Sequence, residues 1–397
     1  MRQGTRGPLD AFTLARRQLE LDRAVIGGDA FLSARKLKKL GASPLGFFRG
    51  SARLFYEMLR AEPALAPAPG PVGHIVGDMH LENIGAYRND ADEVVFDLND
   101  FDDASIGEYA LDRLRVSVSV LLAARAFSGT AAEALSVVGE LLGAYDEVLS
   151  GAPVAAPPKP ITDLCDRARK RTRKDLIESR APIVDGRRRF VRGERYQEMT
   201  ADEQQNIESL VDRYRVALAE RVPPHAKSWR LVDAARRVAG NGSIGRRRIA
   251  FLVADQENTM RMFELKEAAP AAPDVLATSP SSMDASARVV GAACALVAKP
   301  PRQLAALGPT PVGSLVGRKL CPEEDKLDLT TLTVGPKLSG VARVVGGLLG
   351  RAHARDAGMQ NSEPLPVPRD HEEIVDRAVY LAGVFEATYL AFARLAG

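Results

Sequence analysis

The stretch GHIVGDMHLENIG, residues 73–85, carries two histidines, two acidic residues and an asparagine between glycines. A carboxylate such as that of Asp78 can orient a hydroxyl group or accept its proton, and the amide oxygen of Asn83 is the hard kind of ligand that Mg²⁺ prefers. His80 lies between them as a supporting residue. A polar turn after a strand, in which the histidines only satisfy backbone groups, is the alternative.

A second acidic motif follows in VVFDLNDFDDASIGEYALD, residues 94–112. Asp100 comes directly after a predicted strand, so Asn83 and Asp100 flank one predicted hairpin. Asp78 and Asn83 are five residues apart, the spacing at which phosphoryl-transfer loops carry an aspartate that orients the attacking hydroxyl and an asparagine that holds magnesium. A nucleotide would supply the remaining oxygen ligands of Mg²⁺. Residues 97–103 lack the glycine and the distal glutamate of a calcium loop.

A glycine motif, GNGSIG, places Gly240, Gly242 and Gly245 in GxGxxG spacing around Ser243. A dinucleotide fingerprint runs directly into a helix, but here a strand-like segment, RRRIAFLVAD, follows. We therefore predict a hairpin that covers phosphates, with Lys266 on the next strand placed to bind them as a point charge. A glycine-rich turn followed by an exposed lysine is the alternative.

The composition limits the classes of protein that this chain can belong to. With 54 basic and 51 acidic side chains the charge is nearly balanced, which does not indicate nucleic acid or a membrane as a partner. The three cysteines lie far apart without a CxxC pair, which argues against a disulfide framework and favours the cytoplasm. The chain shows no export signal, and its most apolar run, VSVSVLLAARAF, is too short to span a membrane.

These motifs together resemble the protein-kinase-like superfamily, especially its aminoglycoside-phosphotransferase branch, in GDMHLENIG followed by DFDDASIGEYALD. The chain is still more similar to an uncharacterised bacterial family, domain of unknown function 2252. That similarity extends from about residue 30 to the C-terminus through SPLGFFRG, GDMHLENIGAY, VVFDLNDFDDA, LDRLRVS, GNGSIG, LKEA and LGRAHARD.

The resemblance implies an α+β, two-lobed kinase-like fold. Because the glycine motif and Lys266 follow the catalytic loop instead of preceding it, it also implies circular permutation. Its expected parts are an N-terminal helical segment (1–70), a catalytic-loop part of the helical lobe with a basic insert (71–230), a small antiparallel sheet lobe with the glycine loop and lysine (231–325), and C-terminal helices that complete the helical lobe (326–397).

The resemblance also implies a role for each motif residue. Asp78 would be catalytic, Asn83 and Asp100 would hold Mg²⁺, and Asp112 would brace the catalytic loop. Gly240, Gly242, Ser243, Gly245 and Lys266 would bind ATP, with Asp102 as a supporting residue.

Two positions depart from the kinase pattern. Val76 stands where kinase loops usually carry a histidine, and the helix expected after Lys266 has no glutamate to pair with that lysine, unless Glu267 or Asp284 takes its place.

Two other functions therefore stay open beside an ATP-dependent phosphotransferase acting on a hydroxyl acceptor. One is a nucleotide-binding pseudokinase that acts as a sensor or scaffold. The other is a metallophosphoesterase built around Asp78 and His80, although His225, His353 and His371 lack the motifs of further metal ligands.

Two further features have open interpretations. Arg49, among aromatic residues in SPLGFFRG, is expected either to pair with a carboxylate of the site or to pack its stem. The basic segment 167–195 either docks an anionic molecule or forms a solvated surface. The sequence leaves the acceptor and the oligomeric state undetermined.

Overall fold

The protein has a mixed α+β fold, seen in a computed structural model that describes residues 9–127, 129–219, 229–240, 242–279, 282–320, 325–327, 336–360 and 365–396. Twelve α-helices occur in these residues: α1 (Ala11–Ile26), α2 (Ala30–Leu40), α3 (Pro44–Gly50), α4 (Ala52–Ala61), α5 (Tyr109–Ala126), α6 (Ala131–Leu149), α7 (Lys159–Lys170), α8 (Arg173–Arg180), α9 (Ala201–Ala219), α10 (Ala285–Leu296), α11 (Pro336–Gln360) and α12 (His371–Ala396). Two short 3₁₀ helices are η1 (Pro63–Leu65) and η3 (Ala272–Leu276).

The strands pair antiparallel. They are β1 (Val72–Ile75), β2 (Ile84–Arg88), β3 (Val94–Leu98), β4 (Ser105–Glu108), β5 (Ile183–Val184), β6 (Arg187–Arg188), β7 (Tyr196–Gln197), β8 (Arg230–Arg237), β9 (Arg248–Ala254), β10 (Met260–Glu267), β11 (Ala305–Thr310), β12 (Gly313–Lys319) and β13 (Asp325–Lys326). The largest sheet is a curled sheet of six strands in the order β11-β12-β10-β9-β8-β7. Smaller sheets pair β1 with β4, β13 with β2 and β3, and β5 with β6.

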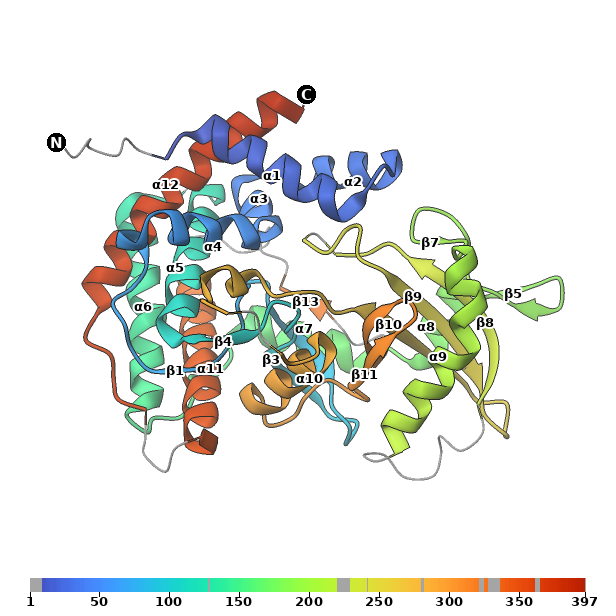
Figure 1. The fold of residues 1–397 in the computed structure, drawn as a ribbon. Coiled ribbons are helices and arrows are strands. Elements are labelled where there is room, and N and C mark those ends of the chain that lie inside the picture. The colour runs from blue at the N-terminus through green and yellow to red at the C-terminus, as the bar shows by residue number, and fades with distance from the viewer. Residues whose placement is uncertain are drawn as a thin grey trace.

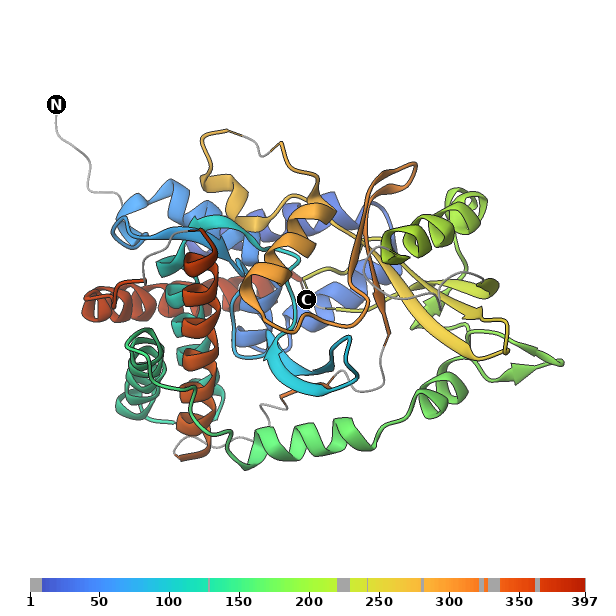
Figure 2. The ribbon, with the colours of Figure 1, turned by 90° about the horizontal axis from the view of Figure 1, so that it is seen from below.

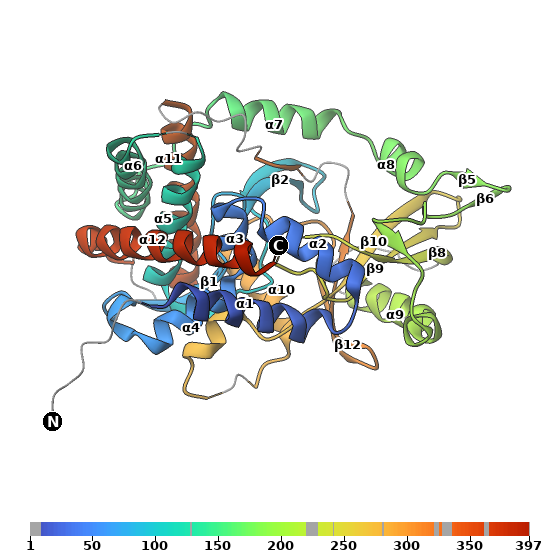
Figure 3. The ribbon, with the colours of Figure 1, turned by 90° about the horizontal axis from the view of Figure 1, so that it is seen from above.

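Helices and sheet occupy different sides of the molecule (Figure 1). Most of the long helices gather on one side, which we call the helical part, and the six-stranded sheet with α8 and α9 lies on the other, which we call the sheet part. Helix α7 runs along one flank from the helical part toward α8 (Figures 2 and 3). Helices α1 and α2 extend from the helical part toward the sheet part (Figure 3).

The first helices begin at the residues that the sequence indicates. Ser43 caps α3 by accepting a hydrogen bond from the backbone N–H of Gly46 at 3.0 Å, and Pro44 occupies the first turn. Asp10 and Asp29 cap α1 and α2 in the same way. These side chains satisfy N–H groups that have no partner inside the helix, so each helix starts at a defined residue.

The β2–β3 hairpin brings two distant parts of the acidic motifs together. Ile84 pairs with Leu98, so the residues just before β2 and just after β3 lie side by side. The backbone N–H of Asn99 donates to the carbonyl of Asn83 at 3.3 Å and extends this pairing past the strands. The hairpin predicted between Asn83 and Asp100 is therefore present, although β1 pairs with β4 and not with this hairpin.

The sheet part contains more of the chain than residues 231–325. Strand β7 pairs with β8, and α9 packs its apolar side on the sheet through Leu210, Tyr214 and Leu218. Gly317 on β12 lies directly under Tyr214, where a Cβ atom would approach the ring to 2.2 Å, so this contact requires glycine. The segment 71–230 thus contributes to both the helical part and the sheet part.

The basic segment lies away from the cavity that Asp78, Asp100 and the glycine motif line. It spans the end of α7, α8 and the β5–β6 hairpin, and no residue of 167–195 lines that cavity. Several of its arginines have acidic partners, such as Arg188 with Glu178 at 2.7 Å and Arg192 with Asp233 at 3.1 Å. These pairs fit the interpretation of a solvated surface.

An aromatic cluster ties α12 to the N-terminal helices. The ring of Phe385 on α12 packs edge-on against Phe48 at 4.9 Å between centroids and also contacts Phe47 and Phe55. Among the described helices, α12 has the length and apolarity of a membrane span, with 39% of its most apolar window buried. One such helix is weak evidence for a membrane, because the core helix of a soluble protein passes the same test.

We predict that Phe385→Ala lowers the free energy of unfolding by about 3 to 5 kcal/mol, because it removes a fully buried ring from this cluster and leaves a cavity. Leu390→Ala on the same helix is the control: its side chain is 63% exposed, so the change should stay within about 0.5 kcal/mol. Urea denaturation followed by circular dichroism measures both. Equal effects of the two variants would contradict this account of the core.

Candidate functional site

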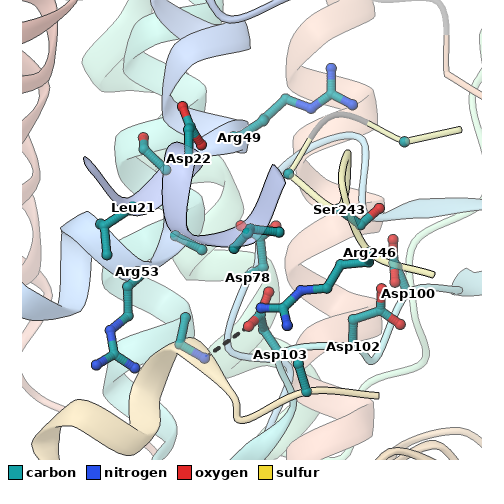
Figure 4. Close-up of a pocket in the computed structure, with 18 of the residues that line it drawn as sticks. Leu21, Asp22, Arg49, Arg53, Asp78, Asp100, Asp102, Asp103, Ser243 and Arg246 are labelled. Atoms are coloured by element: carbon teal, nitrogen blue, oxygen red, sulfur yellow. Dashed lines mark hydrogen bonds between the residues drawn. The ribbon is translucent and has the colours of Figure 1, made fainter. Parts of the chain in front are cut away.

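A cavity of about 360 Å³ lies where the helical part meets the sheet part (Figure 4). Its walls come from α1, α3 and α4, from the loops that follow β1 and β3, and from the glycine motif between β8 and β9. Six acidic and five basic residues line it: Asp22, Asp78, Asp100, Asp102, Asp103, Glu267, Lys36, Arg49, Arg53, Arg246 and Arg248. The motifs that the sequence analysis singled out therefore meet at one cavity.

The loop after β1 is held from below by Asp112, in the first turn of α5. Its buried carboxylate accepts hydrogen bonds from the backbone N–H groups of Val76 at 2.6 Å and Gly77 at 2.9 Å. Nε2 of His353 lies 3.3 Å from the same carboxylate. Gly77 has a φ of +77°, and a Cβ atom there would lie 2.0 Å from the carbonyl oxygen of Asp103, so only glycine fits this turn.

Asp78 follows this turn and faces the cavity beside a buried arginine. Arg115 donates to Oδ1 of Asp78 from Nη2 at 2.6 Å and from Nε at 3.1 Å. The guanidinium also lies 4.2 Å from the ring centroid of Phe48. Burial raises the pKa of Asp78 to about 7, although the charge of Arg115 opposes this rise. A carboxylate with such a pKa can accept a proton near neutral pH.

Asn83 is oriented by the backbone of the same loop. Its Nδ2 donates to the carbonyl oxygen of Asp78 at 3.0 Å. Its Oδ1 is buried and has no hydrogen-bond partner among the described residues. A buried acceptor without a donor is costly, and a cation would satisfy it. Asn83 and Asp100, at the two ends of the hairpin, both line the cavity and carry oxygen atoms of the kind that Mg²⁺ prefers.

Lys266 on β10 pairs with the acidic motif of the helical part. Its Nζ forms an ion pair with Asp102 and lies 3.5 Å from Oδ1 of Asp100. Neither Glu267 nor Asp284, the two possible substitutes for a kinase glutamate, pairs with this lysine. Glu267 instead accepts the backbone N–H of Arg247 at 2.8 Å, and Asp284 caps α10.

The glycine motif is fixed by lysines from α2. Lys36 donates to the carbonyl oxygen of Gly242 at 2.8 Å, and Lys39 donates to that of Gly240. Gly240 and Gly245 have φ angles of +88° and +97°, which favour glycine. The hydroxyl of Ser243 accepts a hydrogen bond from Arg248 at 2.6 Å. The motif thus turns sharply at the edge of the cavity, between the sheet and α2.

The two remaining predicted residues lie beside Asp78 and Asn83. Nδ1 of His80 accepts the backbone N–H of Glu82 at 3.1 Å, and its Nε2 lies 3.8 Å from Oδ2 of Asp78. Arg49 forms an ion pair with Glu82. The partner of Arg49 is therefore the carboxylate of Glu82 in the same loop, and not Asp78 or Asp100.

Sequence reasoning missed three residues that shape this site. Arg115 lies three positions after Asp112, a spacing that places both on one face of α5 below the loop and that could have identified it. Arg288, on α10, donates to the carbonyl oxygens of Asp102 at 3.0 Å and Ala269 at 2.7 Å, and no sequence signal pointed to it. Lys36 lies on α2, which none of the sequence motifs includes.

The histidines do not assemble a metal centre in the described part of the chain. No group of three or more histidine, cysteine, aspartate or glutamate residues there has the arrangement of a metal site. His353 is buried beside Asp112, below the loop that follows β1. His371, the first residue of α12, pairs with Asp146 on α6. His225 lies outside the described residues. A dinuclear phosphoesterase needs several such ligands around each metal pair, so these contacts give that function no support.

We predict that Asp78 makes the stability of the protein depend on pH. The folded carboxyl keeps its proton up to a pKa of about 7, whereas an unfolded chain releases it near 3.8. Because the folded state then binds the extra proton, this contribution to stability is present at low pH and is lost as the pH rises through 7. Between pH 5 and 7 the free energy of unfolding of the wild type should fall more steeply than that of Asp78→Asn, by up to about 1.4 kcal/mol per pH unit.

Urea denaturation at pH 5, 6, 7 and 8 measures this difference in slope. Asp163→Asn, at an exposed position on α7, is the control and should keep the wild-type slope. If Asp78→Asn also kept that slope, Asp78 would not hold a proton near neutral pH.

Comparison with known proteins identifies the family of this chain. The profile of one family, described as an uncharacterized protein conserved in bacteria (domain of unknown function 2252), matches residues 29–394. No curated protein and no solved structure is significantly similar to the chain. Since the match covers nearly the whole sequence and includes every residue of the site except those of α1, the chain belongs to the bacterial family of domain of unknown function 2252.

Proposed function

We propose that this protein is an ATP-dependent phosphotransferase that moves the γ-phosphoryl group of ATP to a hydroxyl acceptor with the help of Mg²⁺. One observation carries the proposal. Lys266, from the sheet part, lies 3.5 Å from Asp100, from the helical part, and Asp100 lines the same cavity as Asp78 and Asn83. A lysine, two magnesium ligands and a base are the groups that phosphoryl transfer requires at one place.

The proposed fold is a two-lobed kinase-like fold in permuted order. In kinases, a glycine-rich loop joins the first strands of the small lobe, and the phosphate-binding lysine lies on the third. Here the glycine motif joins β8 and β9, Lys266 lies on β10, and α10 follows before β11. The pieces that act together need to meet in space and not in sequence, so permutation is compatible with the activity.

Each residue has a distinct task in the proposed reaction. Asn83 and Asp100 would hold Mg²⁺, which neutralises the charge of the nucleotide phosphates when bound. Lys266 would release its ion pair with Asp102 and bind phosphate oxygens of the nucleotide instead. Asp78 orients the acceptor hydroxyl and takes its proton, and Arg115 keeps that carboxylate in place.

A nucleotide-binding pseudokinase is the second candidate, because of two contacts in the site. Arg115 neutralises Asp78, and Lys266 pairs with Asp102 where an active kinase holds the equivalent lysine with a glutamate. In that case the protein binds ATP and transfers nothing. We place either function in the cytoplasm, because the cysteines are far apart and the described ones, Cys165 and Cys294, are not in disulfides.

We predict that ATP binding depends on magnesium, since Asn83 and Asp100 supply only part of a coordination shell that phosphate oxygens complete. Isothermal titration calorimetry with ATP in Mg²⁺ and in EDTA measures the effect, and removal of the metal should weaken binding by at least about tenfold. Equal affinity in both buffers would count against the proposed site.

We further predict that two aspartate variants differ in kind. Asp78→Asn should leave the affinity for ATP and Mg²⁺ within a few-fold, while turnover of ATP, measured as ADP release, falls by about two to four orders of magnitude. Asp100→Asn should weaken the binding of ATP with Mg²⁺ itself, because it removes a charged ligand of the metal.

The same variants discriminate among the three functions. If Asp78→Asn abolished metal binding in the absence of nucleotide, Asp78 would be a ligand of a preformed metal centre, as a phosphoesterase requires. If both variants folded normally and neither changed turnover, the pseudokinase would be the better account. Circular dichroism spectra of each variant provide the folding control.

A further inference from the structure

Three consecutive arginines, Arg246 to Arg248, follow the glycine motif, and two of them are held by the protein itself. Arg247 donates to the carbonyl oxygen of Val312 and lies 3.1 Å from the carboxylate of Glu203 on α9. Arg248 donates to the hydroxyl of Ser243 at 2.6 Å and lies 3.5 Å from Glu264. Both guanidinium groups therefore serve the packing and the charge balance of the sheet part.

Arg246 differs from its two neighbours. Its side chain lines the cavity and extends from the glycine motif toward Asp103 (Figure 4). The guanidinium has no hydrogen bond or ion pair with any described residue. Its charge nevertheless acts on Asp103. Burial raises the pKa of this carboxyl, and the charge of Arg246 is one of the influences that oppose the rise. It is thus a half-buried cation that lines the cavity without a hydrogen bond or ion pair to any described residue.

The other basic residues of the cavity all have partners. Arg49 pairs with Glu82, Arg53 donates to Glu57 at 3.2 Å, and Lys36 lies 3.4 Å from Asp22. Placing a guanidinium in a partly desolvated cavity without a carboxylate partner costs free energy. A negatively charged ligand in the cavity would recover that cost, and the planar guanidinium can bind two oxygens of a phosphoryl group at once.

We propose that Arg246 is a catalytic residue that contacts the phosphoryl group during its transfer and stabilises the charge on its oxygens. This inference rests on the proposed function and adds to it. Lys266 binds the nucleotide at the side of Asp100 and Asp102, whereas Arg246 reaches toward Asp103, next to the loop of Asp78 where the acceptor hydroxyl would lie. Arg246 is therefore placed between the donor and the acceptor.

The proposed reaction is an in-line transfer of the γ-phosphoryl group from ATP to the acceptor hydroxyl. The bond between the γ-phosphorus and the oxygen that bridges the β- and γ-phosphates breaks, and a bond between that phosphorus and the acceptor oxygen forms. The proton of the acceptor hydroxyl goes to Asp78, and ADP leaves with the bridging oxygen. Because the three equatorial oxygens carry the negative charge in the transition state, a guanidinium there accelerates transfer without being needed to bind ADP.

The experiment compares binding of ADP with Mg²⁺ in the absence and presence of aluminium fluoride, which forms a planar or octahedral mimic of the transferred phosphoryl group. The probe is titrated into the full chain by calorimetry. The wild type should bind ADP at least about tenfold more tightly with aluminium fluoride than without it, since transition-state mimics gain the contacts that the ground state lacks.

Arg246→Gln should lose that gain and keep its affinity for ADP alone within about threefold, and Arg246→Lys should recover part of the gain. Arg247→Gln is the matched control and should keep both affinities, because its guanidinium contacts α9 and the strand ends instead of the cavity. ADP release should fall by about two to three orders of magnitude in Arg246→Gln and should not change in Arg247→Gln.

The possible failures are distinguishable. If the wild type bound neither ATP nor ADP, both the proposed function and the proposed role of Arg246 would be overturned. If the wild type gained affinity with aluminium fluoride and Arg246→Gln kept the gain, only the role of Arg246 would be overturned. If Arg246→Gln lost affinity for ADP alone as strongly as for the mimic, Arg246 would be an ordinary nucleotide-binding residue. A wild type that binds ADP without any gain would also overturn this role and would favour the pseudokinase.

Discussion

The carboxylate of Asp112 holds the site together. It lies fully buried in the first turn of α5 and accepts two backbone N–H groups of the loop that presents Asp78. Without it those N–H groups would be buried and unpaired, at a cost of about 1 to 3 kcal/mol each. Arg115, one turn further along α5, then contacts the carboxylate of Asp78 itself. One helix therefore positions both the backbone of this loop and the side chain of Asp78.

The network continues below the loop into the helical part. His353 on α11 contacts Asp112, and its other nitrogen lies 3.0 Å from the hydroxyl of Tyr145 on α6. Asp356, one turn after His353, accepts the backbone N–H of His74 and the hydroxyl of Tyr109, both at 2.7 Å. Strand β1 and the loop after it are thus fixed by polar groups of three helices. Such a network resists displacement because the loss of any member leaves a buried polar group unpaired.

Charge balance links the two sides of the cavity. The carboxylates of the acidic motif after β3 repel one another. Lys266 from β10 forms an ion pair with Asp102, and Arg288 from α10 donates to the carbonyl oxygen of the same residue. The glycine motif is held in turn by Lys36 and Lys39 from α2. The acidic motif and the glycine motif therefore each depend on cations supplied by another part of the chain. This exchange of contacts explains why residues far apart in sequence form one site. Among the described basic residues that line the cavity, it leaves Arg246 without a hydrogen bond or ion pair.

The sequence by itself determined the elements and the local motifs. The hairpin that joins Asn83 to Asp100, the cap at Ser43 and the hairpin of β9 and β10 follow from strand patterns, capping residues and turns, which act over a few residues. Tertiary structure alone decided the partners. Nothing local marks Asp102 as the partner of Lys266 or α2 as the support of the glycine motif, because these contacts join segments more than about 100 residues apart. For the same reason, the sequence identified Asp78 as a candidate base but not the burial and the arginine that together set its charge. The pKa of a carboxyl depends on which groups the fold packs around it.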